Sequence, residues 1–470
     1  MTSRAFTKSR APFVAVCASG WFGYLMPGCS HPDQPGGAGT GLPTSTSVGD
    51  ASDDESSSET GSVSSEDGTV GSSSPTGAAD PTTSDDTSGG TTTLMGTTTG
   101  DSTIATTTST MDDSTSAMDV TSDDGAPAES DTGVPPTTLD PGTVAQIDGV
   151  FSPWDKPDSL GCAVAVARDG AVAYQRGYGV TNLTTKQPIT GKTVFYLASM
   201  SKQVTGAAIA LAVEDGEVTV EDGIRTHLPS LPGYADDIRV RHLLYHTSGL
   251  TEYLIDLSSP KTNADAIDFL AGKTLDFTTG SQYNYTNTNY VVLAELVRAS
   301  TGMSFRQFAQ QRMFMPLEMN HTQVRDETSP TIPPNSATGY ILNAGSWIDT
   351  TPFLETFFAN GDGNVWSCAE DMVKWGSNFG NQVVGGAAWF SMMTTSGKTD
   401  YGASVDYAFG IIPDSHAGRP TVSHNGVALG YYTQGIYFTD GDGDAVVVLC
   451  NAGAEARADD LAPQVVNIVF

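Results

Sequence analysis

The sequence predicts an α+β domain in which strands from the two ends of the folded part form one antiparallel sheet, flanked by helices, with an inserted mainly helical region. Alternating apolar runs joined by short turns occur near both ends of residues 144–470, a pattern typical of β-hairpins. Between these runs the apolar residues follow a helical period. Strands at both ends with helices between them favour one sheet built from the two ends.

The two end hairpins are predicted from runs with defined turns. LGCAVAVARDGAVAYQRGYG (160–179) contains two apolar runs joined by Asp-Gly, a dipeptide typical of tight hairpin turns. YYTQGIYF and AVVVLCNA, within 431–452, are joined by TDGDGD. This acidic turn is only partly like a calcium loop, because Ala445 stands where the loop needs glycine and Asn451 where it needs a bidentate acid. We therefore predict a tight hairpin turn there.

Three helices are predicted between the hairpins. Apolar residues in 200–212 keep a helical spacing that stops at Gly216. YVVLAELVRA (290–299) forms a second helix, closed by Gly302. The third helix follows a capping box, SCAE (367–370).

Composition separates a tether from the folded domain. Residues 31–140 are almost entirely Ser, Thr, Gly, Asp, Pro and Ala, with no Lys or Arg and 20 acidic residues. Such a segment buries too little apolar surface to offset the entropy of ordering it, and its charge keeps it extended. We therefore predict a disordered acidic tether at 30–143 and a folded domain at 144–470.

Residues 1–29 predict an export signal. A basic start precedes an apolar stretch at 11–26 that is short for a membrane span. Cys29 follows this stretch and resembles the lipidation site of a bacterial lipoprotein, in which the signal is cut before the cysteine. The resemblance implies an exported protein that is anchored in the bacterial cell envelope. Met26 and Pro27 depart from that motif, so plain secretion or retention of the segment is the alternative.

Charge and cysteine content limit the partners and cofactors. Residues 141–470 contain 19 Lys plus Arg against 34 Asp plus Glu, which argues against nucleic acid or an anionic membrane surface as a partner. The sequence has no Cys/His pattern typical of zinc sites, and we expect no metal and no cofactor. Cys162 and Cys450 lie in apolar runs and are predicted to be small buried residues, while a disulfide stays open.

The first motif with residues suited to catalysis is FYLASMSKQV (195–204). Ser199 and Lys202 lie one helical turn apart at a helix N-terminus, where the helix dipole favours negative charge on the serine oxygen. Burial lowers the pKa of a lysine, which then accepts protons near neutrality. The alternative is a capping serine and a solvated lysine. A second Ser-x-x-Lys, at 258–261, lies in a polar loop with proline and shows that the pattern also arises by chance.

Two further motifs precede a helix and a hairpin. Tyr285 and Asn287 are two residues apart in an extended segment and so point to the same side. A phenol can move a proton, and an amide can orient a lysine and bind a substrate carbonyl. In His424-Asn425-Gly426 the glycine permits close approach to a ligand. Taken singly, Tyr285 and Asn287 are more typical of an Asn-rich turn with a packed aromatic, and His424 is more typical of a loop histidine.

Ser-x-x-Lys, Tyr-x-Asn and His-x-Gly in this order resemble the serine β-lactamase and penicillin-binding superfamily, in particular its class C β-lactamase-like branch with D,D-peptidase, D-aminopeptidase and esterase relatives. The flanks RHLLYHTSGL (241–250) and GSQYNYTNTNY (280–290) are similar as well. The resemblance covers most of 145–470 and implies a β-lactamase/transpeptidase-like fold.

The resemblance also implies catalytic roles. Ser199 would attack a carbonyl and form an acyl-enzyme, while Lys202 and Tyr285 would take its proton and pass it to the leaving group. Asn287 would orient Lys202 and the substrate amide. The backbone N–H groups of Ser199 and Val427 would form the oxyanion hole.

One departure from the family pattern bears on the substrate. Where class C β-lactamases carry Lys-Thr-Gly, this chain has His424 and Gly426 around Asn425, and histidine is mostly neutral at pH 7. The resemblance places His424 on an edge strand, in contact with the substrate or Tyr285. We therefore expect a serine hydrolase for a small-molecule or peptide substrate, as an esterase or a D-amino-acid-directed peptidase. A class C-like β-lactamase is the alternative, and a non-catalytic sensor or scaffold is a third interpretation.

Overall fold

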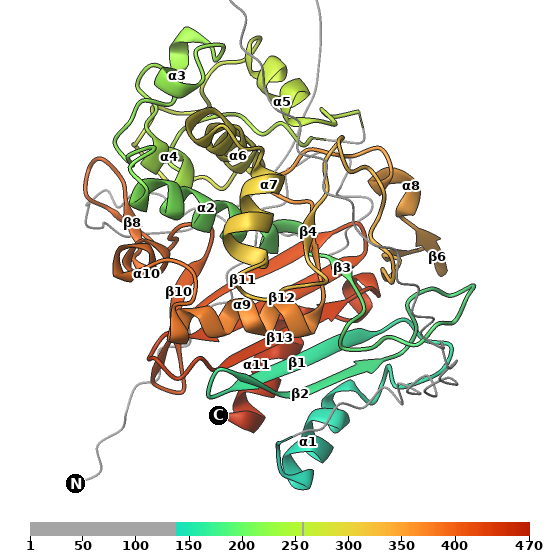
Figure 1. Ribbon diagram of the computed structural model, residues 1–470. Coiled ribbons are helices and arrows are strands. Elements are labelled where there is room, and N and C mark those ends of the chain that lie inside the picture. Colours follow the sequence, from blue (N-terminus) through green and yellow to red (C-terminus); the bar gives the residue numbers. More distant parts are fainter. Residues whose placement is uncertain (1–137, 256–257) are drawn as a thin grey trace, which may run out of the picture. The chain divides into compact units, whose positions relative to one another are not determined.

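A six-stranded antiparallel sheet contains strands from both ends of the described chain (Figure 1). The computed structural model describes residues 138–255 and 258–470. The predicted export signal, Cys29 and residues 30–137 of the predicted tether lie outside the described residues.

The described helices and strands have the following bounds. The helices are α1 (Pro141–Phe151), η2 (Ala198–Ser201), α2 (Lys202–Glu214), α3 (Ile224–His227), η3 (Gly233–Ala235), α4 (Val240–Leu244), α5 (Asn263–Leu270), α6 (Asn287–Thr301), α7 (Phe305–Ala309), η4 (Gln310–Phe314), α8 (Thr351–Leu354), α9 (Ala369–Asn381), α10 (Ala387–Thr394), η5 (Gly453–Glu455) and α11 (Ala458–Val469). The strands are β1 (Cys162–Arg168), β2 (Ala171–Tyr178), β3 (Phe195–Tyr196), β4 (Gln323–Val324), β5 (Tyr340–Asn343), β6 (Ser346–Asp349), β7 (Val365–Ser367), β8 (Gly397–Lys398), β9 (Ser404–Val405), β10 (Ile412–His416), β11 (Arg419–Ala428), β12 (Tyr431–Phe438) and β13 (Ala445–Cys450).

The strand order places the N-terminal hairpin beside the last strand of the chain. The order in the main sheet is β10-β11-β12-β13-β1-β2, and β1 pairs antiparallel with β13. Asp169 and Gly170, which join β1 to β2, have φ values of 52° and 75°, the left-handed conformation that closes tight hairpins. The predicted sheet from both chain ends is therefore confirmed, and the fold class is α+β.

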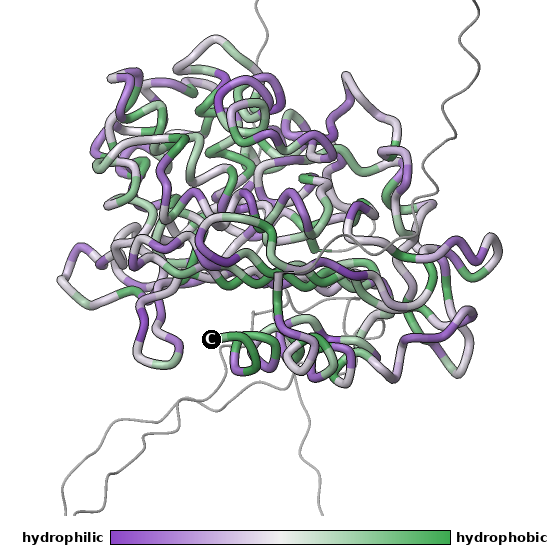
Figure 2. Tube along the Cα trace, turned by 60° about the horizontal axis from the view of Figure 1, so that its bottom comes forward, coloured by the Kyte–Doolittle hydropathy of each residue, from purple (hydrophilic) through white to green (hydrophobic). Residues whose placement is uncertain are grey.

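Helices cover both faces of this sheet, which explains why its central strands are apolar throughout. Alternate residues of β1 and β13 belong to two different cores, one shared with α2 and α9 and the other with α1 and α11. Strands buried on both faces have continuous apolar sequences instead of alternating ones. Figure 2 shows hydrophobic residues along the sheet strands and in the C-terminal helix.

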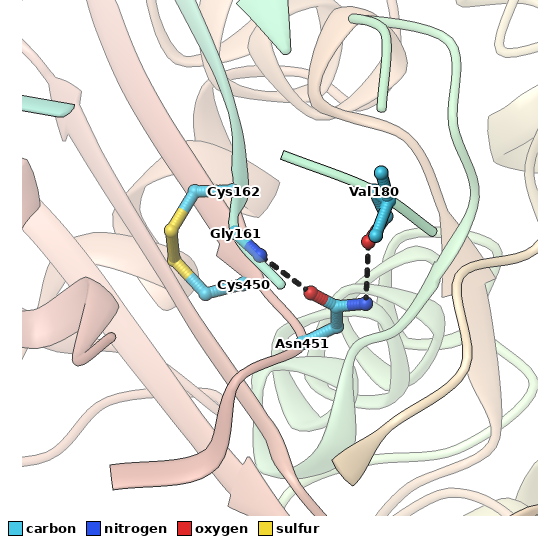
Figure 3. The surroundings of a disulfide bond; sticks show 5 residues. All are labelled: Gly161, Cys162, Val180, Cys450 and Asn451. Carbon is cyan, nitrogen blue, oxygen red and sulfur yellow. Dashed lines mark hydrogen bonds between the residues drawn. A yellow bond between two sulfur atoms is a disulfide. The ribbon is translucent and has the colours of Figure 1, made fainter. Parts of the chain in front are cut away.

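A disulfide joins β1 and β13, two adjacent inner strands of the sheet (Figure 3). Cys162 in β1 and Cys450 in β13 lie directly opposite each other, although 288 positions separate them in the sequence. Beside it, Asn451 Oδ1 accepts a hydrogen bond from Gly161 N at 2.9 Å, and Asn451 Nδ2 donates to Val180 O at 3.2 Å. The two cysteines are buried, as predicted, but they are a covalent link and not merely small core residues.

Removing this disulfide is expected to lower the free energy of unfolding by about 3–5 kcal/mol, because the bridge closes a long loop in the unfolded chain. The variant is Cys162→Ala/Cys450→Ala, compared with wild type by chemical denaturation under non-reducing conditions. Cys368→Ala is the matched control, because Cys368 is also buried but is not disulfide-bonded. A double variant that is as stable as the control would contradict the prediction.

The three predicted helices are present, but one begins at a different cap. Gly302 ends α6 with φ 74°, as expected for a left-handed C-cap. The side chain that caps α9 is Cys368, whose Sγ accepts from Asp371 N, so the predicted cap at Ser367 is wrong by one residue. Ser367 is instead the last residue of β7, where it pairs with Phe195.

Helix α1 begins before the predicted domain boundary. Asp140 caps it by accepting hydrogen bonds from Gly142 N and Thr143 N, and Pro141 occupies its first turn. Residues 141–143 are therefore helical where the sequence suggested tether. In the ranges that the structure describes, no helix combines the length and the apolar character needed to cross a membrane.

The acidic turn between β12 and β13 is organised by an arginine. The Arg419 guanidinium forms ion pairs with Asp440, Asp442 and Asp444, at 2.5, 3.1 and 2.8 Å. The guanidinium supplies the positive charge that three clustered carboxylates require. The predicted hairpin turn is confirmed. In the described part of the chain, no group of three or more His, Cys, Asp or Glu side chains is arranged to hold a metal ion.

Candidate active site

Ser199 lies in η2, a short turn of 3₁₀ helix between β3 and α2. In the fully described stretch 193–212, Ser199 alone is not buried. Leu197 N donates to Val365 O at 3.0 Å, and Thr433 Oγ1 donates to Leu197 O at 2.8 Å, so β7 and β12 hold the turn in place. Ala198 has φ 51°, an unfavourable conformation for a residue with a Cβ. The fold therefore presents one serine from a rigid, strained turn.

Lys202 is fully buried and has three oxygen atoms around its amine. Lys202 Nζ lies 2.7 Å from Asn287 Oδ1, 2.9 Å from Asp362 O and 3.2 Å from Ser199 Oγ. The two carbonyl oxygens are acceptors only, so they bind two N–H groups of the amine. In the neutral amine the lone pair is then left for the Ser199 hydroxyl. The arrangement can accept the serine proton.

Burial lowers the pKa of Lys202 to about 8. The carboxyl groups of Asp362 and Glu252 oppose this shift, because their negative charges favour the protonated amine. Burial also raises the pKa of the Asp362 carboxyl, and the lysine charge lowers it. Lys202 thus exchanges its proton much closer to neutral pH than an exposed lysine does.

The predicted Tyr-x-Asn motif meets this lysine. Asn287 is the first residue of α6, and the Tyr285 ring centroid lies 5.0 Å from Lys202 Nζ. The His246 ring packs against Tyr285 at a centroid distance of 4.4 Å. The structure therefore brings Ser199, Lys202, Tyr285 and Asn287 together from segments more than 80 residues apart.

A second segment, 246–253, holds the Tyr285–Asn287 motif in place through hydrogen bonds to Thr286 and Asn289. His246 Nδ1 accepts from Thr286 N at 3.2 Å and from Asn289 Nδ2 at 3.1 Å, so its proton is on Nε2. Ser248 Oγ donates to Asn289 Oδ1 at 2.6 Å. His246 and Ser248 belong to the flank RHLLYHTSGL, which resembles the family. The resemblance alone gave no role to these two residues.

Glu252 and Asp362 were missed at the sequence level. Glu252 contacts the backbone and side chain of Asn287, and Asp362 presents its backbone carbonyl to Lys202. Tyr253 OH also donates to Asp362 Oδ2 at 3.0 Å, which links the two loops. Both acids lie in loops without periodicity, so no pattern in the sequence indicated them.

Strand β11 forms the other wall of the site. The pairing of β11 with β10 ends at Ile412, opposite Ser423. From His424 to Ala428, the described register pairs β11 with β12 on one edge only. A Cβ added at Gly426 would lie 2.1 Å from Leu197 O and 3.0 Å from Met200 N. Glycine therefore lets the β11 backbone, with Val427 next in line, lie directly against the Ser199 turn.

His424 contacts two groups of the protein through its ring nitrogens. The imidazole is buried, its Nδ1 donates to Asn425 O at 2.5 Å, and its Nε2 accepts from Tyr407 OH at 2.9 Å. Burial lowers its pKa to about 3, so the ring is neutral. Tyr407 in turn lies near Tyr285, at a ring centroid distance of 6.2 Å, and the implied contact of His424 with the substrate or Tyr285 stays a prediction. Both ring nitrogens of His424 are engaged within the protein.

The second Ser-x-x-Lys is not part of this arrangement. Residues 258–261 contain a turn and a bend and belong to no helix or strand, and Lys261 Nζ lies 6.0 Å from the centroid of the Phe357 ring. Its serine and lysine are not on a helix, in contrast to Ser199 and Lys202.

Comparison with known proteins gives consistent similarities. The family model described as Beta-lactamase matches residues 149–469. A penicillin-binding protein of Bacillus subtilis is 30% identical over 59% of this chain and 65% of its own length. A D-aminopeptidase of Gluconobacter oxydans is 25% identical over 63% of this chain and 57% of its own length. The chain thus spans about three fifths of the length of these curated relatives.

Solved structures share the fold. The D-amino acid amidase of Ochrobactrum anthropi SV3 superimposes with a TM-score of 0.60 and 23% identity, over 70% of this chain and 98% of its own. The penicillin-binding protein homologue of Pyrococcus abyssi also has a TM-score of 0.60, with 22% identity over 70% of this chain and 77% of its own.

Proposed function

This chain belongs to the Beta-lactamase family, a family of serine hydrolases, and we propose that it cleaves an ester, amide or peptide bond through a Ser199 acyl-enzyme. The observation that carries the proposal is the buried Lys202 amine, which lies between Ser199 Oγ and two carbonyl acceptors. Those acceptors orient the amine so that its lone pair faces the serine hydroxyl.

In the proposed acylation step, Ser199 Oγ forms a bond to the substrate carbonyl carbon while its proton moves to Lys202. The backbone N–H groups of Ser199 and Val427 stabilise the resulting oxyanion. The bond to the leaving group then breaks, and the leaving group receives the proton through Lys202 and Tyr285. Water next attacks the acyl-enzyme, which releases the acid and restores Ser199.

We propose substrates that need no cation on β11, such as esters and D-amino-acid amides or peptides. His424 is buried and neutral, so it offers no positive charge to a substrate carboxylate. The similarity to a D-aminopeptidase and to the fold of a D-amino acid amidase supports this preference. A class C-like β-lactamase is the second candidate, favoured by the complete Ser199, Lys202, Tyr285 and Asn287 set.

We further propose that the domain works outside the cytoplasm, anchored through Cys29 by the tether. A buried disulfide supports this, because disulfides persist in oxidising compartments and are rare in the cytosol.

Covalent labelling of the full-length chain tests the nucleophile. A fluorophosphonate is expected to add once to wild type and not to Ser199→Ala, as measured by intact mass. Ser258→Ala, from the second Ser-x-x-Lys, is the matched control and should label like wild type. Unlabelled wild type, or labelling of Ser199→Ala, would overturn the proposal and favour a non-catalytic sensor or scaffold.

The same variants separate the substrate classes. Release of amine from D-phenylalanine amide but not from its L-enantiomer supports a D-amino-acid-directed amidase or peptidase. A penicillin adduct on Ser199 that forms and decays supports the β-lactamase, and one that persists supports a penicillin-binding peptidase. Hydrolysis of a simple ester without either activity supports an esterase.

The labelling rate is expected to rise about tenfold per pH unit up to about pH 8 and then level off, because Lys202 accepts a proton only when it is neutral. The carboxyl groups that face Lys202 are Glu252 and Asp362, and burial raises the pKa of both, that of Asp362 to about 6. His246 and His424 are neutral because burial lowers the pKa of each. Fluorophosphonate labelling from pH 5.5 to 10 measures this profile. A rate that keeps rising to pH 10 would indicate an unshifted lysine and contradict the prediction.

A further inference from the structure

We propose that Glu252 is a positioning residue, which fixes the Asn287 side-chain amide so that its oxygen faces Lys202. The inference rests on the proposed function, since Asn287 matters to catalysis only if Lys202 is the base. Glu252 lies 35 positions before Asn287 in the sequence, in the loop that follows the HTSG residues 246–249.

The contacts of Glu252 converge on the start of α6. Its Oε2 accepts from Asn287 N at 2.8 Å, from Asn287 Nδ2 at 3.3 Å and from Thr286 Oγ1 at 3.2 Å. Its Oε1 accepts from Leu254 N at 2.9 Å, which fixes the carboxylate in turn. The α6 N-terminus also favours a negative charge at this place. Glu252 thus serves as the N-terminal partner of α6 that the Thr286 side chain does not provide.

The choice of a carboxylate has a consequence for the amide. The two ends of an asparagine amide have nearly the same shape, and only the hydrogen-bond partners decide which end is the oxygen. If the Asn287 amide flipped, its NH₂ group would point at the N–H of Lys202, and its oxygen at the Glu252 carboxylate. Both contacts would then be repulsive. The ionised Glu252 carboxylate can accept hydrogen bonds but cannot donate them. It therefore selects the orientation of the amide in which Asn287 Oδ1 lies 2.7 Å from Lys202 Nζ.

That contact determines where the lysine lone pair points. Lys202 Nζ uses Asn287 Oδ1 and Asp362 O as acceptors and is left with Ser199 Oγ as its third neighbour. With the Asn287 acceptor lost, the amine is free to rotate away from the serine. Glu252 acts on the reaction through Asn287, because its hydrogen bonds described above join it to Leu254, Thr286 and Asn287 and not to the serine.

A double-mutant cycle on the full-length chain tests this role. The variants are Glu252→Gln, Asn287→Ala and the pair, and the readout is the rate of fluorophosphonate labelling of Ser199. This probe carries no ammonium group that could bind Glu252 directly. We expect Glu252→Gln to slow labelling about 10- to 100-fold in wild type, but less than about threefold in Asn287→Ala, because the residue it positions is gone. Thr286→Val, which removes only the hydroxyl contact, is the control and should stay within about threefold of wild type.

A reversal of sign adds a second measurement. Asn287→Asp keeps an oxygen toward Lys202 but places a second carboxylate against Glu252. In that background Glu252→Gln is expected to raise the labelling rate, whereas it lowers the rate in wild type. A loss of folding common to all Glu252 variants would lower the rate in every background, and circular dichroism monitors it.

Two results overturn the proposal. Equal slowing by Glu252→Gln with and without Asn287 would show that Glu252 acts independently of the amide. Unchanged labelling with a raised KM for D-phenylalanine amide would show that Glu252 binds the substrate ammonium instead. Failure of wild type to label refutes the proposed function itself and is distinguishable from both.

Discussion

Lys202→Met is expected to slow fluorophosphonate labelling of Ser199 on the order of 10³-fold, because the variant keeps an unbranched side chain, one atom shorter, but removes the base. Lys202 is the only cation within hydrogen-bonding distance of Ser199 Oγ among the described contacts, at 3.2 Å. Labelling is followed by intact mass at pH 8.5, where the wild-type lysine is mostly neutral. Lys261→Met, from the second Ser-x-x-Lys, is the matched control and should label like wild type. A Lys202→Met rate within tenfold of wild type would mean that another group takes the proton.

The same variant has an expected effect on stability. Burial lowers the pKa of Lys202 from its usual 10.5 to about 8, so between these values the unfolded chain binds more protons than the folded one. The contribution of Lys202 to stability therefore increases as the pH rises from 8 to 10.5, and its full penalty, about 3 kcal/mol, applies below pH 8. Lys202→Met removes this penalty but leaves Asn287 Oδ1 and Asp362 O without their donor. We expect the two effects to offset to within about 2 kcal/mol at pH 7 in urea unfolding.

Gly426→Ala is expected to slow labelling by about 10²-fold and to lower the free energy of unfolding by about 1–3 kcal/mol. The added Cβ would lie 2.1 Å from Leu197 O, so β11 must move away from the Ser199 turn. That movement shifts Val427 N, which we propose as half of the oxyanion hole. The labelling rate should therefore fall by more than the fraction of molecules that the lower stability leaves unfolded.

The control for Gly426→Ala is the same chemical change at an open position. Gly149 in α1 has no heavy atom within 4 Å of an added Cβ, so Gly149→Ala should leave labelling unchanged. Urea unfolding and labelling rates are measured on both variants. If Gly426→Ala were labelled at the wild-type rate, β11 would have room for a Cβ at this point and the site would not need the glycine.

The parts of the fold that local sequence determines were predictable. The β1–β2 turn depends on Asp169 and Gly170, and the end of α6 depends on Gly302. In both cases the residues that determine the feature lie at the feature itself. The family that the three ordered motifs resembled is also confirmed, because the Beta-lactamase family model matches residues 149–469. Local spacing alone did not choose between a capping and a catalytic Ser199.

Features that depend on distant segments were not predictable. Cys162 and Cys450 become neighbours only through the β1–β13 register, and no local signal specifies that register. Burial keeps His424 neutral, and its Nε2 accepts from Tyr407, which lies in a different segment of the chain. Glu252 is a single acidic residue in a loop, and only the fold places it at the start of α6.

The pairing of β1 with β13 also sets an order of events during biosynthesis. The β1–β2 hairpin emerges from the ribosome long before β13, its neighbour in the sheet, because 288 positions separate Cys162 from Cys450. Pairs so distant in sequence form slowly, because a long loop must close before the contacts stabilise it. A nascent chain therefore stays without its β1–β13 pair, and without its disulfide, until β13 has been synthesised. A stop codon before Ala445 would remove β13 and α11 together, and the resulting chain would lose the middle of its sheet instead of a dispensable tail.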